Sequence, residues 1–178
     1  MDADIKFKIC LFGDFAVGKT TLATRYLTNL FHKNMRITLG MEIHVKDLEV
    51  EGKKINLQIW DFGGQRQFRY LLPAYARGAF GSIYMYDITN KESVEEIGPW
   101  LEAYHEGLRE DDSQVPRLLV GGKADLKDQR QITKKQAKKL KEKYGFWDLM
   151  ECSSITGENV EEIFSRLVRE IMKLRGFL

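Results

Sequence analysis

The order of apolar and polar positions along the chain predicts strands and helices in alternation. Residues 5–12 are mostly apolar, with Lys6 and Lys8 between apolar positions, and this composition is typical of a buried strand. Residues 43–50 and 54–60 alternate between apolar and polar side chains around the turn Glu51-Gly52-Lys53, and this pattern predicts a β-hairpin. Shorter apolar runs predict three later strands, at 81–86, 117–121 and 148–152.

Helical spacing of apolar residues fills the segments between these strands. Four helices are expected, over about 21–30, 93–108, 134–144 and 160–172. The apolar face of the first helix would consist of Leu22, Tyr26, Leu27 and Leu30. In the second helix Pro99 is expected to start a fresh turn after a kink, because proline removes a backbone donor. At the start of the last helix, Asn159 with Glu162 three residues later resembles a capping box.

Strands that alternate with helices predict an α/β fold. The expected sheet has six strands and is mostly parallel, with one antiparallel edge strand from the hairpin and helices on both faces. A chain of 178 residues without linkers, repeats or low-complexity segments predicts one domain over residues 1–178. In such sheets ligands bind beyond the carboxyl ends of the strands, where this chain carries its most distinctive motifs.

The charge of the chain gives no indication of a nucleic-acid partner. The chain has 28 basic and 26 acidic residues, a net charge of +2, so it lacks the strong positive field that such binding requires. Six lysines lie between positions 134 and 143, where they are expected to solvate the outer face of a helix. Attraction to anionic lipid is the weaker interpretation of this basic run.

The two cysteines, Cys10 and Cys152, are expected singly in separate strands. This arrangement indicates ordinary packing in a reducing compartment, and we therefore expect a cytoplasmic protein. No run of eighteen apolar residues predicts a transmembrane segment. Residues 174–178 contain no cysteine for prenylation, so peripheral attachment to a membrane would require a lipidated tail beyond them.

The segment Gly13–Thr20 matches G-x-x-x-x-G-K-[ST] between the first strand and the first helix. In this setting backbone N–H groups turn toward a phosphate, and the helix dipole adds partial positive charge. Lys19 is expected to reach the β- and γ-phosphates, and Thr20 to offer its hydroxyl to Mg²⁺. A chance turn is the alternative, which the flanking strand and helix oppose. The expected phosphate contacts are Gly13, Phe15, Ala16, Val17, Gly18, Lys19, Thr20 and Thr21.

A phosphate loop alone does not distinguish a kinase, an ATPase and a GTPase. Asp61 closes an apolar strand, the position from which a Walker-B aspartate holds Mg²⁺. Strand-end aspartates also commonly cap turns, which is the structural alternative. Gly63 and Gly64 permit close approach of the backbone, and Gln65 follows them where it could orient a water molecule.

With these motifs, further segments make the chain resemble the Ras superfamily of small GTPases, and its Rab-like branch most, from Lys6 to about Met172. The further segments are Thr38–Glu42, Leu57–Asp61, Tyr75–Ala79, Tyr86–Asn90, Lys123–Leu126, Glu151–Ser153 and Thr156–Asn159. The resemblance implies a P-loop NTPase (Ras-like) fold and a monomeric switch that binds GTP or GDP with Mg²⁺ and slowly hydrolyses GTP. It also implies an exchange factor, an activating protein and an effector at the two switch segments, in membrane traffic or signalling.

The resemblance implies roles for individual residues at the phosphates. The magnesium ligands would be Thr20, Thr38 and Asp61. Gly64 would donate its backbone N–H to the γ-phosphate, and Gln65 would position the attacking water. Lys19 would be the second catalytic residue, stabilising the charge that develops. Loss of the γ-phosphate would release Thr38 and Gly64, and partners would read that change.

For the base, the resemblance implies that Phe31 stacks on guanine and that Lys123 lies along the base and the ribose. Asp125 would accept from the guanine N1–H and the exocyclic amine, a donor pair that adenine lacks. Backbone donors near the guanine O6 would come from Ser153, Ser154 and Ile155. Each residue alone has a structural alternative, such as a core aromatic for Phe31 or a turn former for Asp125.

Two positions depart from the family pattern with direct consequences for the nucleotide. Gly122 replaces the asparagine of Asn-Lys-x-Asp, whose side chain ties the base loop to the phosphate loop. We therefore expect weaker nucleotide affinity and faster release. Phe15 stands where Ras has a glycine, and its ring is expected to obstruct an arginine supplied in trans unless it folds away.

Other departures lie in the loops around the site. Ile155 and Ser154 replace the lysine and the alanine of the base-supporting turn, which leaves backbone donation intact. Met35 replaces the first-switch tyrosine that usually covers the phosphates. Arg36 and Arg66 flank the same space, and one of them is a candidate intrinsic arginine finger, although exposed loop arginines are usually only solvated.

A GTP-loaded interaction module with negligible turnover is the alternative to an active GTPase. Phe15 and Gly122 favour the module, whereas the retained Thr38, Asp61 and Gln65 favour turnover. A third class, a small phosphoryl-transfer kinase, would need an arginine-rich lid over its second substrate, and the sequence contains no such segment.

Overall fold

The computed structural model of the protein describes residues 5–108 and 115–178. In these residues six strands form one sheet in the order β2-β3-β1-β4-β5-β6. The strand β2 is antiparallel to β3, and the other neighbours are parallel. The strands are β1 (Ile5–Gly13), β2 (Met41–Val50), β3 (Lys53–Phe62), β4 (Gly81–Asp87), β5 (Arg117–Gly122) and β6 (Asp148–Glu151). The predicted α/β fold, with the hairpin strand as its antiparallel edge, is confirmed.

Helices connect the strands of the sheet. The α-helices are α1 (Lys19–Thr28), α2 (Leu72–Ala76), α3 (Ile97–Gly107), α4 (Lys134–Tyr144) and α5 (Val160–Leu174). Short 3-10 helices are η1 (Arg66–Leu71), η2 (Lys91–Val94) and η4 (Lys127–Gln129). Among the described residues, no helix combines the length and the apolar character needed to cross a bilayer.

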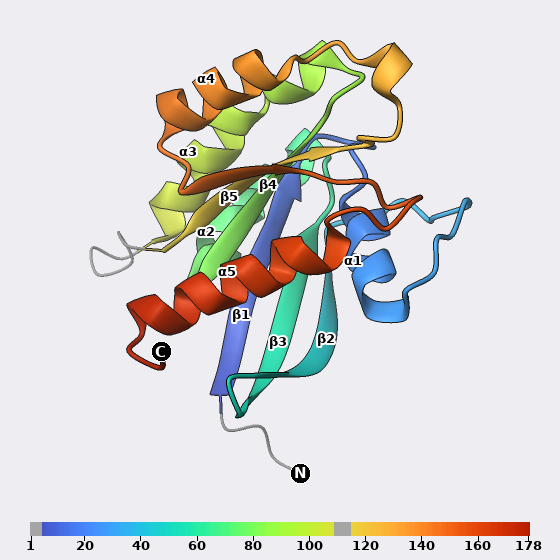
Figure 1. The fold of residues 1–178 in the computed structure, drawn as a ribbon. Coiled ribbons are helices and arrows are strands. Elements are labelled where there is room, and N and C mark those ends of the chain that lie inside the picture. The colour runs from blue at the N-terminus through green and yellow to red at the C-terminus, as the bar shows by residue number, and fades with distance from the viewer. Residues whose placement is uncertain (1–4, 109–114) are drawn as a thin grey trace.

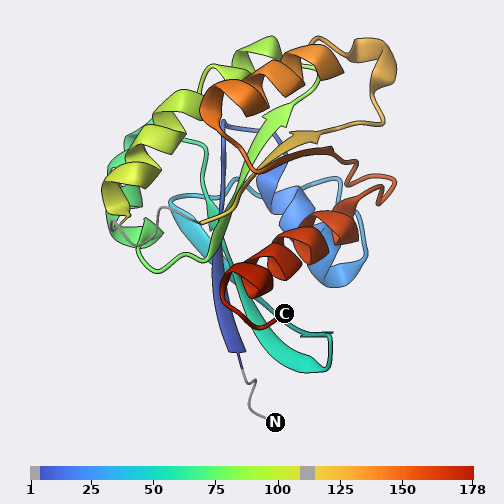
Figure 2. The same cartoon turned by 60° about the vertical axis from the view of Figure 1, so that its left-hand side comes forward.

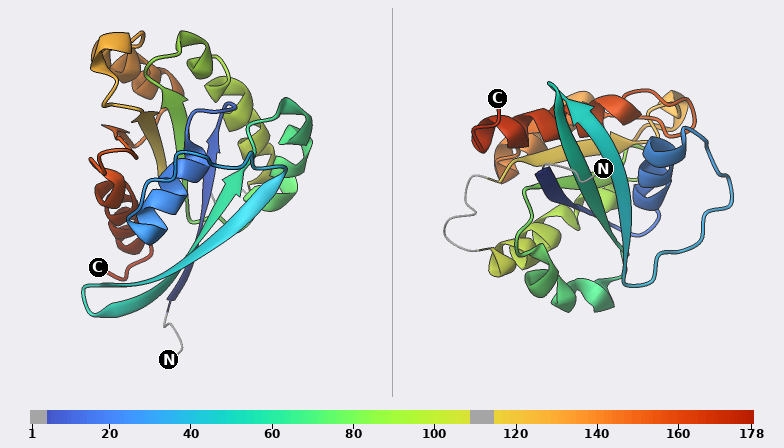
Figure 3. Two further views of the ribbon diagram at one scale, coloured as in Figure 1. Left: turned by 90° about the vertical axis from the view of Figure 1, so that its right-hand side faces the viewer. Right: turned by 90° about the horizontal axis from the view of Figure 1, so that it is seen from below.

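The helices form a layer on each face of the sheet. The pair α1 and α5 covers one face, and α2, α3 and α4 cover the other (Figures 1 and 3). Alternation along β1 directs Ile9 and Leu11 toward the first pair and Phe12 toward the other helices. Tyr26 of α1 stacks on Phe164 of α5, with 4.0 Å between ring centroids. Because both faces of β1 are buried, the loop that follows it starts from a rigid support.

The register of the parallel strands brings their carboxyl ends to one edge of the sheet. Leu11 of β1 lies beside Asp61 of β3, and Asp87 of β4 lies beside Gly122 of β5. The loops after these strands therefore meet at this edge. The C-terminal residues lie at the opposite end, near the start of β1 (Figure 2).

Two of the predicted helices differ from the observed ones. The helix α1 begins at Lys19 and ends at Thr28, so Leu30 lies outside it and is 59% exposed. Asn29 ends this helix because it adopts a left-handed conformation, with φ 58°. The predicted helix 93–108 is η2 followed by α3. Pro99 lies in the first turn of α3, where backbone N–H groups have no acceptor within the helix, so the missing N–H of proline costs no helical hydrogen bond.

The capping box predicted at α5 is wrong, and the structure has one at α4. Asn159 is left-handed, with φ 58°, and makes no cap hydrogen bond to α5. Its Nδ2 instead donates to the Glu151 carbonyl at 2.8 Å. At α4 the side chains of Thr133 and Gln136 each accept from the backbone N–H of the other residue. Thr133 can do so because its backbone is extended, which aims its hydroxyl at the first turn.

Candidate functional site

The phosphate loop, residues 13–20, joins β1 to α1 through unusual backbone angles. Gly13 has φ 149°, and a Cβ there would lie 2.4 Å from the Met85 carbonyl oxygen, so only glycine fits. Ala16 and Gly18 have φ values of 59° and 102°. Such left-handed residues turn successive N–H groups toward one side and create a concave anion site. The N-terminus of α1 adds its partial positive charge at the same place.

The side chain of Lys19 is held inside this loop and is 6% exposed. Its Nζ donates to the carbonyl of Gly13 at 2.9 Å and to that of Asp14 at 2.7 Å. Burial lowers the pKa of Lys19 to about 8, while the carboxylates of Asp61 and Asp14 act to raise it. A buried cation of this kind gains strong partners when phosphate oxygens come within hydrogen-bond distance.

The three residues predicted as magnesium ligands lie together beside the phosphate loop. The hydroxyl oxygens of Thr20 and Thr38 are 2.6 Å apart, and Thr20 Oγ1 also donates to Asp61 Oδ2. Asp61 is fully buried, and its Oδ1 has no hydrogen-bond partner among the described residues. Oxygen donors that include a carboxylate are the ligands that Mg²⁺ prefers, so these residues suit that ion.

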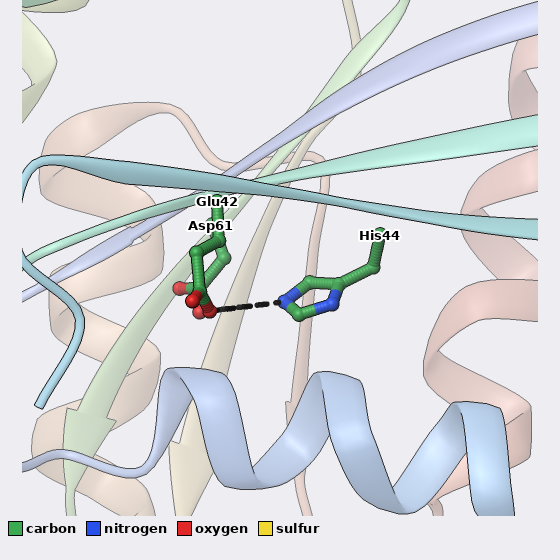
Figure 4. A group of neighbouring side chains, drawn as sticks. All are labelled: Glu42, His44 and Asp61. Carbon is green, nitrogen blue, oxygen red and sulfur yellow. Dashed lines mark ion pairs between the residues drawn. The ribbon is translucent and has the colours of Figure 1, made fainter. Parts of the chain in front are cut away.

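A histidine that sequence reasoning missed lies next to Asp61. His44 Nε2 is 3.8 Å from Asp61 Oδ2 and 3.9 Å from Glu42 Oε2, and Figure 4 shows its ring directed at both carboxyl groups. The contact with Asp61 is the main cause of a raised pKa at His44, which burial opposes and Glu42 reinforces. Antiparallel pairing sets Glu42 opposite Asp61, and strand alternation puts His44 on the same face. The hairpin register was therefore the signal that could have found it.

Gly63 and Gly64 allow the segment after β3 to pack against both neighbouring loops. A Cβ on Gly64 would lie 2.4 Å from the backbone nitrogen of Phe15, and a Cβ on Gly63 would lie 2.5 Å from the Thr38 carbonyl oxygen. Gln65 Nε2 donates to that same carbonyl of Thr38 at 3.1 Å. The two segments that the resemblance names as switches therefore contact each other and the phosphate loop.

A cavity of about 380 Å³ opens beyond the carboxyl ends of the strands, a size in the range of small-molecule sites. Its wall comes from Met85 and from parts of 15–21, 31–38, 62–64, 122–126 and 154–155. The residues predicted as nucleotide, metal or catalytic contacts that do not line it are Gly13, Asp61, Gln65 and Ser153. Phe15 is 51% exposed and Phe31 is 38% exposed at this wall, so the ring of Phe15 does not fold away.

The loop after β6 fixes the carboxylate of Asp125. Ser153 Oγ donates to Asp125 Oδ1 at 2.6 Å and accepts from the Thr156 N–H at 3.1 Å. The Ala124 N–H donates to the Cys152 carbonyl at 2.9 Å, which joins the two loops through their backbones. Asp125 remains partly exposed and lines the cavity, so its carboxylate can accept donors from a ligand.

Lys123 ties the base loop to the phosphate loop, a connection that Gly122 has no side chain to make. Lys123 Nζ donates to Asp87 Oδ2 at 2.5 Å and to the Ala16 carbonyl at 3.1 Å. Sequence reasoning included Asp87 in the segment Tyr86–Asn90 but predicted no role for it; it is buried at the end of β4. A Cβ on Gly122 would lie 3.1 Å from the Val17 carbonyl oxygen, so a longer side chain there would reach the phosphate loop.

The substituted loop positions occupy different places. Met35, Arg36, Ser154 and Ile155 line the cavity, and Ile155 is 52% exposed. Arg66 does not line it, because its Nη2 donates to Glu96 Oε1 at 2.6 Å, in the direction of α3. Of the two candidate arginine fingers, only Arg36 therefore faces the cavity.

Comparison with known proteins agrees with this geometry. A model of the Ras family matches residues 8–173. The chain is 41% identical to the human Ras-related protein Rab-8B over 169 residues, which cover 95% of this chain and 80% of that protein. It is 40% identical to Ras-related protein Rab-13 of Canis lupus familiaris over 173 residues, covering 97% and 83% of the two chains. For Ras-related protein RABA5a of Arabidopsis thaliana the identity is 39% over 171 residues, covering 96% and 76%. The chain therefore belongs to the Ras family, as a Rab-like small GTPase that binds guanine nucleotides and hydrolyses GTP.

Proposed function

We propose that the nucleotide lies in the cavity beside the phosphate loop and that segments 38–42 and 65–75 carry the switch signal. The convergence of Thr20, Thr38 and Asp61 is the observation that supports this most directly, since the Thr38 hydroxyl contacts that of Thr20, which in turn donates to Asp61. A terminal phosphate bound at this point would hold Thr38 and Gly64 on the phosphate loop. Its loss would release both segments, and partners would distinguish the two states.

Thr20, Thr38 and Asp61 would hold the magnesium ion. When bound, Mg²⁺ would neutralise part of the charge on the β- and γ-phosphate oxygens. Lys19 would exchange its loop carbonyls for phosphate oxygens, and the phosphate-loop amides would donate to the charge that develops during hydrolysis. Gln65, which donates to the Thr38 carbonyl, would turn its amide to orient the attacking water.

Guanine would be selected by the loops after β5 and β6. Asp125, oriented by the Ser153 hydroxyl, would accept from the N1–H and the amine of the base. Phe31 would stack on the ring, and Lys123 would lie along the base and the ribose. Backbone donors near the guanine O6 would come from Ser153, Ser154 and Ile155.

Hydrolysis without an activating protein should be slow. An arginine supplied in trans contributes about 10³–10⁵ in rate to related enzymes. Phe15, half-exposed beside Gly64, occupies space that such an arginine would need. We therefore propose that an activating protein for this GTPase approaches the phosphates in a way that avoids the Phe15 ring.

The switch segments would also bind an effector and an exchange factor. Leu39 and Tyr70 in these segments are 74% and 76% exposed, and Ile43, directly after the first segment, is 48% exposed; such apolar side chains suit a protein partner. The relatives of this chain include Rab proteins, and we propose a role in membrane traffic or signalling. The chain would act as one monomeric G domain in the cytoplasm, and any attachment to a membrane would be peripheral.

Loss of the Gln65 amide tests the hydrolysis mechanism. In Gln65→Leu we expect single-turnover phosphate release from bound GTP to slow by at least about tenfold, because the attacking water loses its orienting group. Affinity for GTP should stay within a factor of about two, since Gln65 does not line the cavity. Rapid-mixing measurement of phosphate release checks this, and an unchanged rate would remove Gln65 from the mechanism.

Restoring the missing asparagine tests the expected fast nucleotide release. The amide of Gly122→Asn should donate to the Val17 carbonyl, and Met85 Cε, 3.1 Å from the added Cβ, can shift to admit it. One such hydrogen bond, worth about 1 kcal/mol, should slow GDP release by about five- to tenfold. Gly122→Ala is the matched control because it adds the Cβ without the amide. Equal release rates from the two variants, measured with fluorescent GDP, would contradict the prediction.

A further inference from the structure

A buried carboxylate on the α3 side of the sheet binds two arginines of the second switch. Glu96 directly precedes α3 and is 8% exposed. Its Oε1 accepts from Arg66 Nη2 at 2.6 Å, and its Oε2 accepts from Arg69 Nη2. The Arg69 guanidinium also lies over the ring of Trp100 of α3, 4.8 Å from the centroid. Both oxygens of one carboxylate are thus used to hold η1 against α3.

These ion pairs add to the limited apolar packing of η1. None of the six residues Arg66–Leu71 is fully buried: Phe68, Arg69 and Leu71 are half-buried and the other three are exposed, so apolar packing fixes this segment only in part. Glu96 is shielded from water, and a buried carboxylate that loses its cations is strongly destabilised. The carboxylate therefore favours the arrangement in which Arg66 and Arg69 remain on it. The ion pairs therefore hold η1 in place together with this partial packing.

The arginine pair adjoins the glutamine that we assign to the attacking water. Gln65 is the residue before η1, with extended backbone (φ −75°, ψ 127°), and Arg66 follows it directly. Gln65 is thus fixed from two sides, by the ion pair of Arg66 with Glu96 and by its own hydrogen bond to the Thr38 carbonyl at 3.1 Å. If Arg66 leaves Glu96, the backbone position of Gln65 loses one of these two restraints.

We propose that Glu96 is a positioning residue for GTP hydrolysis, which acts through Arg66 to hold Gln65 where it orients water. This inference rests on the proposed role of Gln65. It assigns to Arg66 a structural task on Glu96 in place of a direct catalytic one. It also makes hydrolysis, but not nucleotide binding, depend on a contact outside the nucleotide cavity.

The test is single-turnover hydrolysis by Glu96→Gln, which keeps the shape and removes the charge. We expect phosphate release to slow by about tenfold, within the 10²-fold that a small misplacement can cost. The release rate of fluorescent GDP should not change, since Glu96 does not line the cavity. Amide hydrogen exchange over residues 66–71 should become faster. The matched control is Glu95→Gln, the same change at the exposed neighbouring position, which should behave as the wild type.

The same Glu96→Gln change made in the Gln65→Leu variant distinguishes an effect on the position of Gln65 from a general effect on the structure. In Gln65→Leu, the further change Glu96→Gln should cause no additional loss of hydrolysis rate, because both act on the same water. A loss that persists in that background, an increased GDP release rate, or a hydrolysis rate equal to that of Glu95→Gln would overturn the inference. If Gln65→Leu by itself leaves hydrolysis unchanged, the proposed role of Gln65 fails and this inference fails with it, whereas the other outcomes leave that role intact.

Discussion

Replacement of Lys19 by alanine is expected to lower the affinity for both GTP and GDP by about 10²–10⁴-fold. Lys19 is buried with its Nζ 2.9 Å from the Gly13 carbonyl and 2.7 Å from the Asp14 carbonyl, inside the turn that would surround the phosphates. Two charge-assisted hydrogen bonds to phosphate oxygens are worth about 1.5–3 kcal/mol each. Lys123 cannot replace the lost charge, because its Nζ already donates to Asp87 and to the phosphate-loop backbone.

Lys8→Ala is the matched control for this variant. Lys8 is also partly buried and donates to two backbone carbonyls, those of Tyr75 and Arg77, but it does not line the cavity. Titration of fluorescent GDP into nucleotide-free protein measures the affinity of both variants. Equal losses would mean that removal of a buried lysine, and not the loss of phosphate recognition, had caused the effect.

The lowered pKa of Lys19 adds a pH signature to the same experiment. Without nucleotide its pKa is about 8, and phosphate oxygens favour the charged ammonium, so a bound nucleotide raises that pKa. Binding therefore takes up protons at pH values between the two pKa values, and affinity falls as the pH rises above about 8. Below that range Lys19 is charged in both states, and this group contributes no pH dependence. Calorimetry in two buffers with different ionisation enthalpies should show the proton uptake in the wild type but not in Lys19→Ala.

The features that could be predicted from the sequence are local or periodic. The phosphate loop is one continuous segment whose glycines and lysine carry their own geometry, and the hairpin follows from alternation around Glu51-Gly52-Lys53. The mostly parallel sheet with helices on both faces followed because strands that alternate with helices allow few arrangements. The meeting of Thr20, Thr38 and Asp61 is different, since spacing alone does not bring them together. It was expected only through the resemblance to the Ras superfamily.

The features that could not be predicted depend on backbone conformation or on tertiary contacts. A pattern of Asn and Glu three residues apart resembles a capping box, but Asn159 is left-handed and cannot form one. Helical periodicity cannot show that η2 and α3 are separate segments. The pairing of Glu96 with Arg66 joins residues thirty positions apart, one in η1 and the other directly before α3. Arg66 is indicated only as a candidate arginine finger, and Glu96 alone looks like an ordinary surface charge, so the sequence does not indicate that the two pair.

Replacement of Asp125 by alanine is expected to reduce the preference for GTP over ATP by about 10²-fold or more. The carboxylate is the group that would accept both donors of the guanine edge, and each hydrogen bond to a charged acceptor is worth about 1.5–3 kcal/mol. Adenine offers an acceptor where guanine offers N1–H, so the wild-type carboxylate rejects ATP as well as binding GTP. Alanine removes both effects, so the affinity for GTP should fall and the affinity for ATP should rise. Competition of each nucleotide against fluorescent GDP measures the ratio.

Two further variants separate recognition of the base from general damage to the loop. Asp128→Ala removes an exposed carboxylate three residues further on, in η4, and should leave the ratio unchanged. Ser153→Ala keeps the Asp125 carboxylate but removes the hydroxyl that donates to its Oδ1 at 2.6 Å. The ratio should then fall less than in Asp125→Ala, because the carboxylate remains charged but is held less firmly. If Asp125→Ala keeps the wild-type ratio of GTP affinity to ATP affinity, the backbone donors of residues 153–155 must select guanine instead of Asp125.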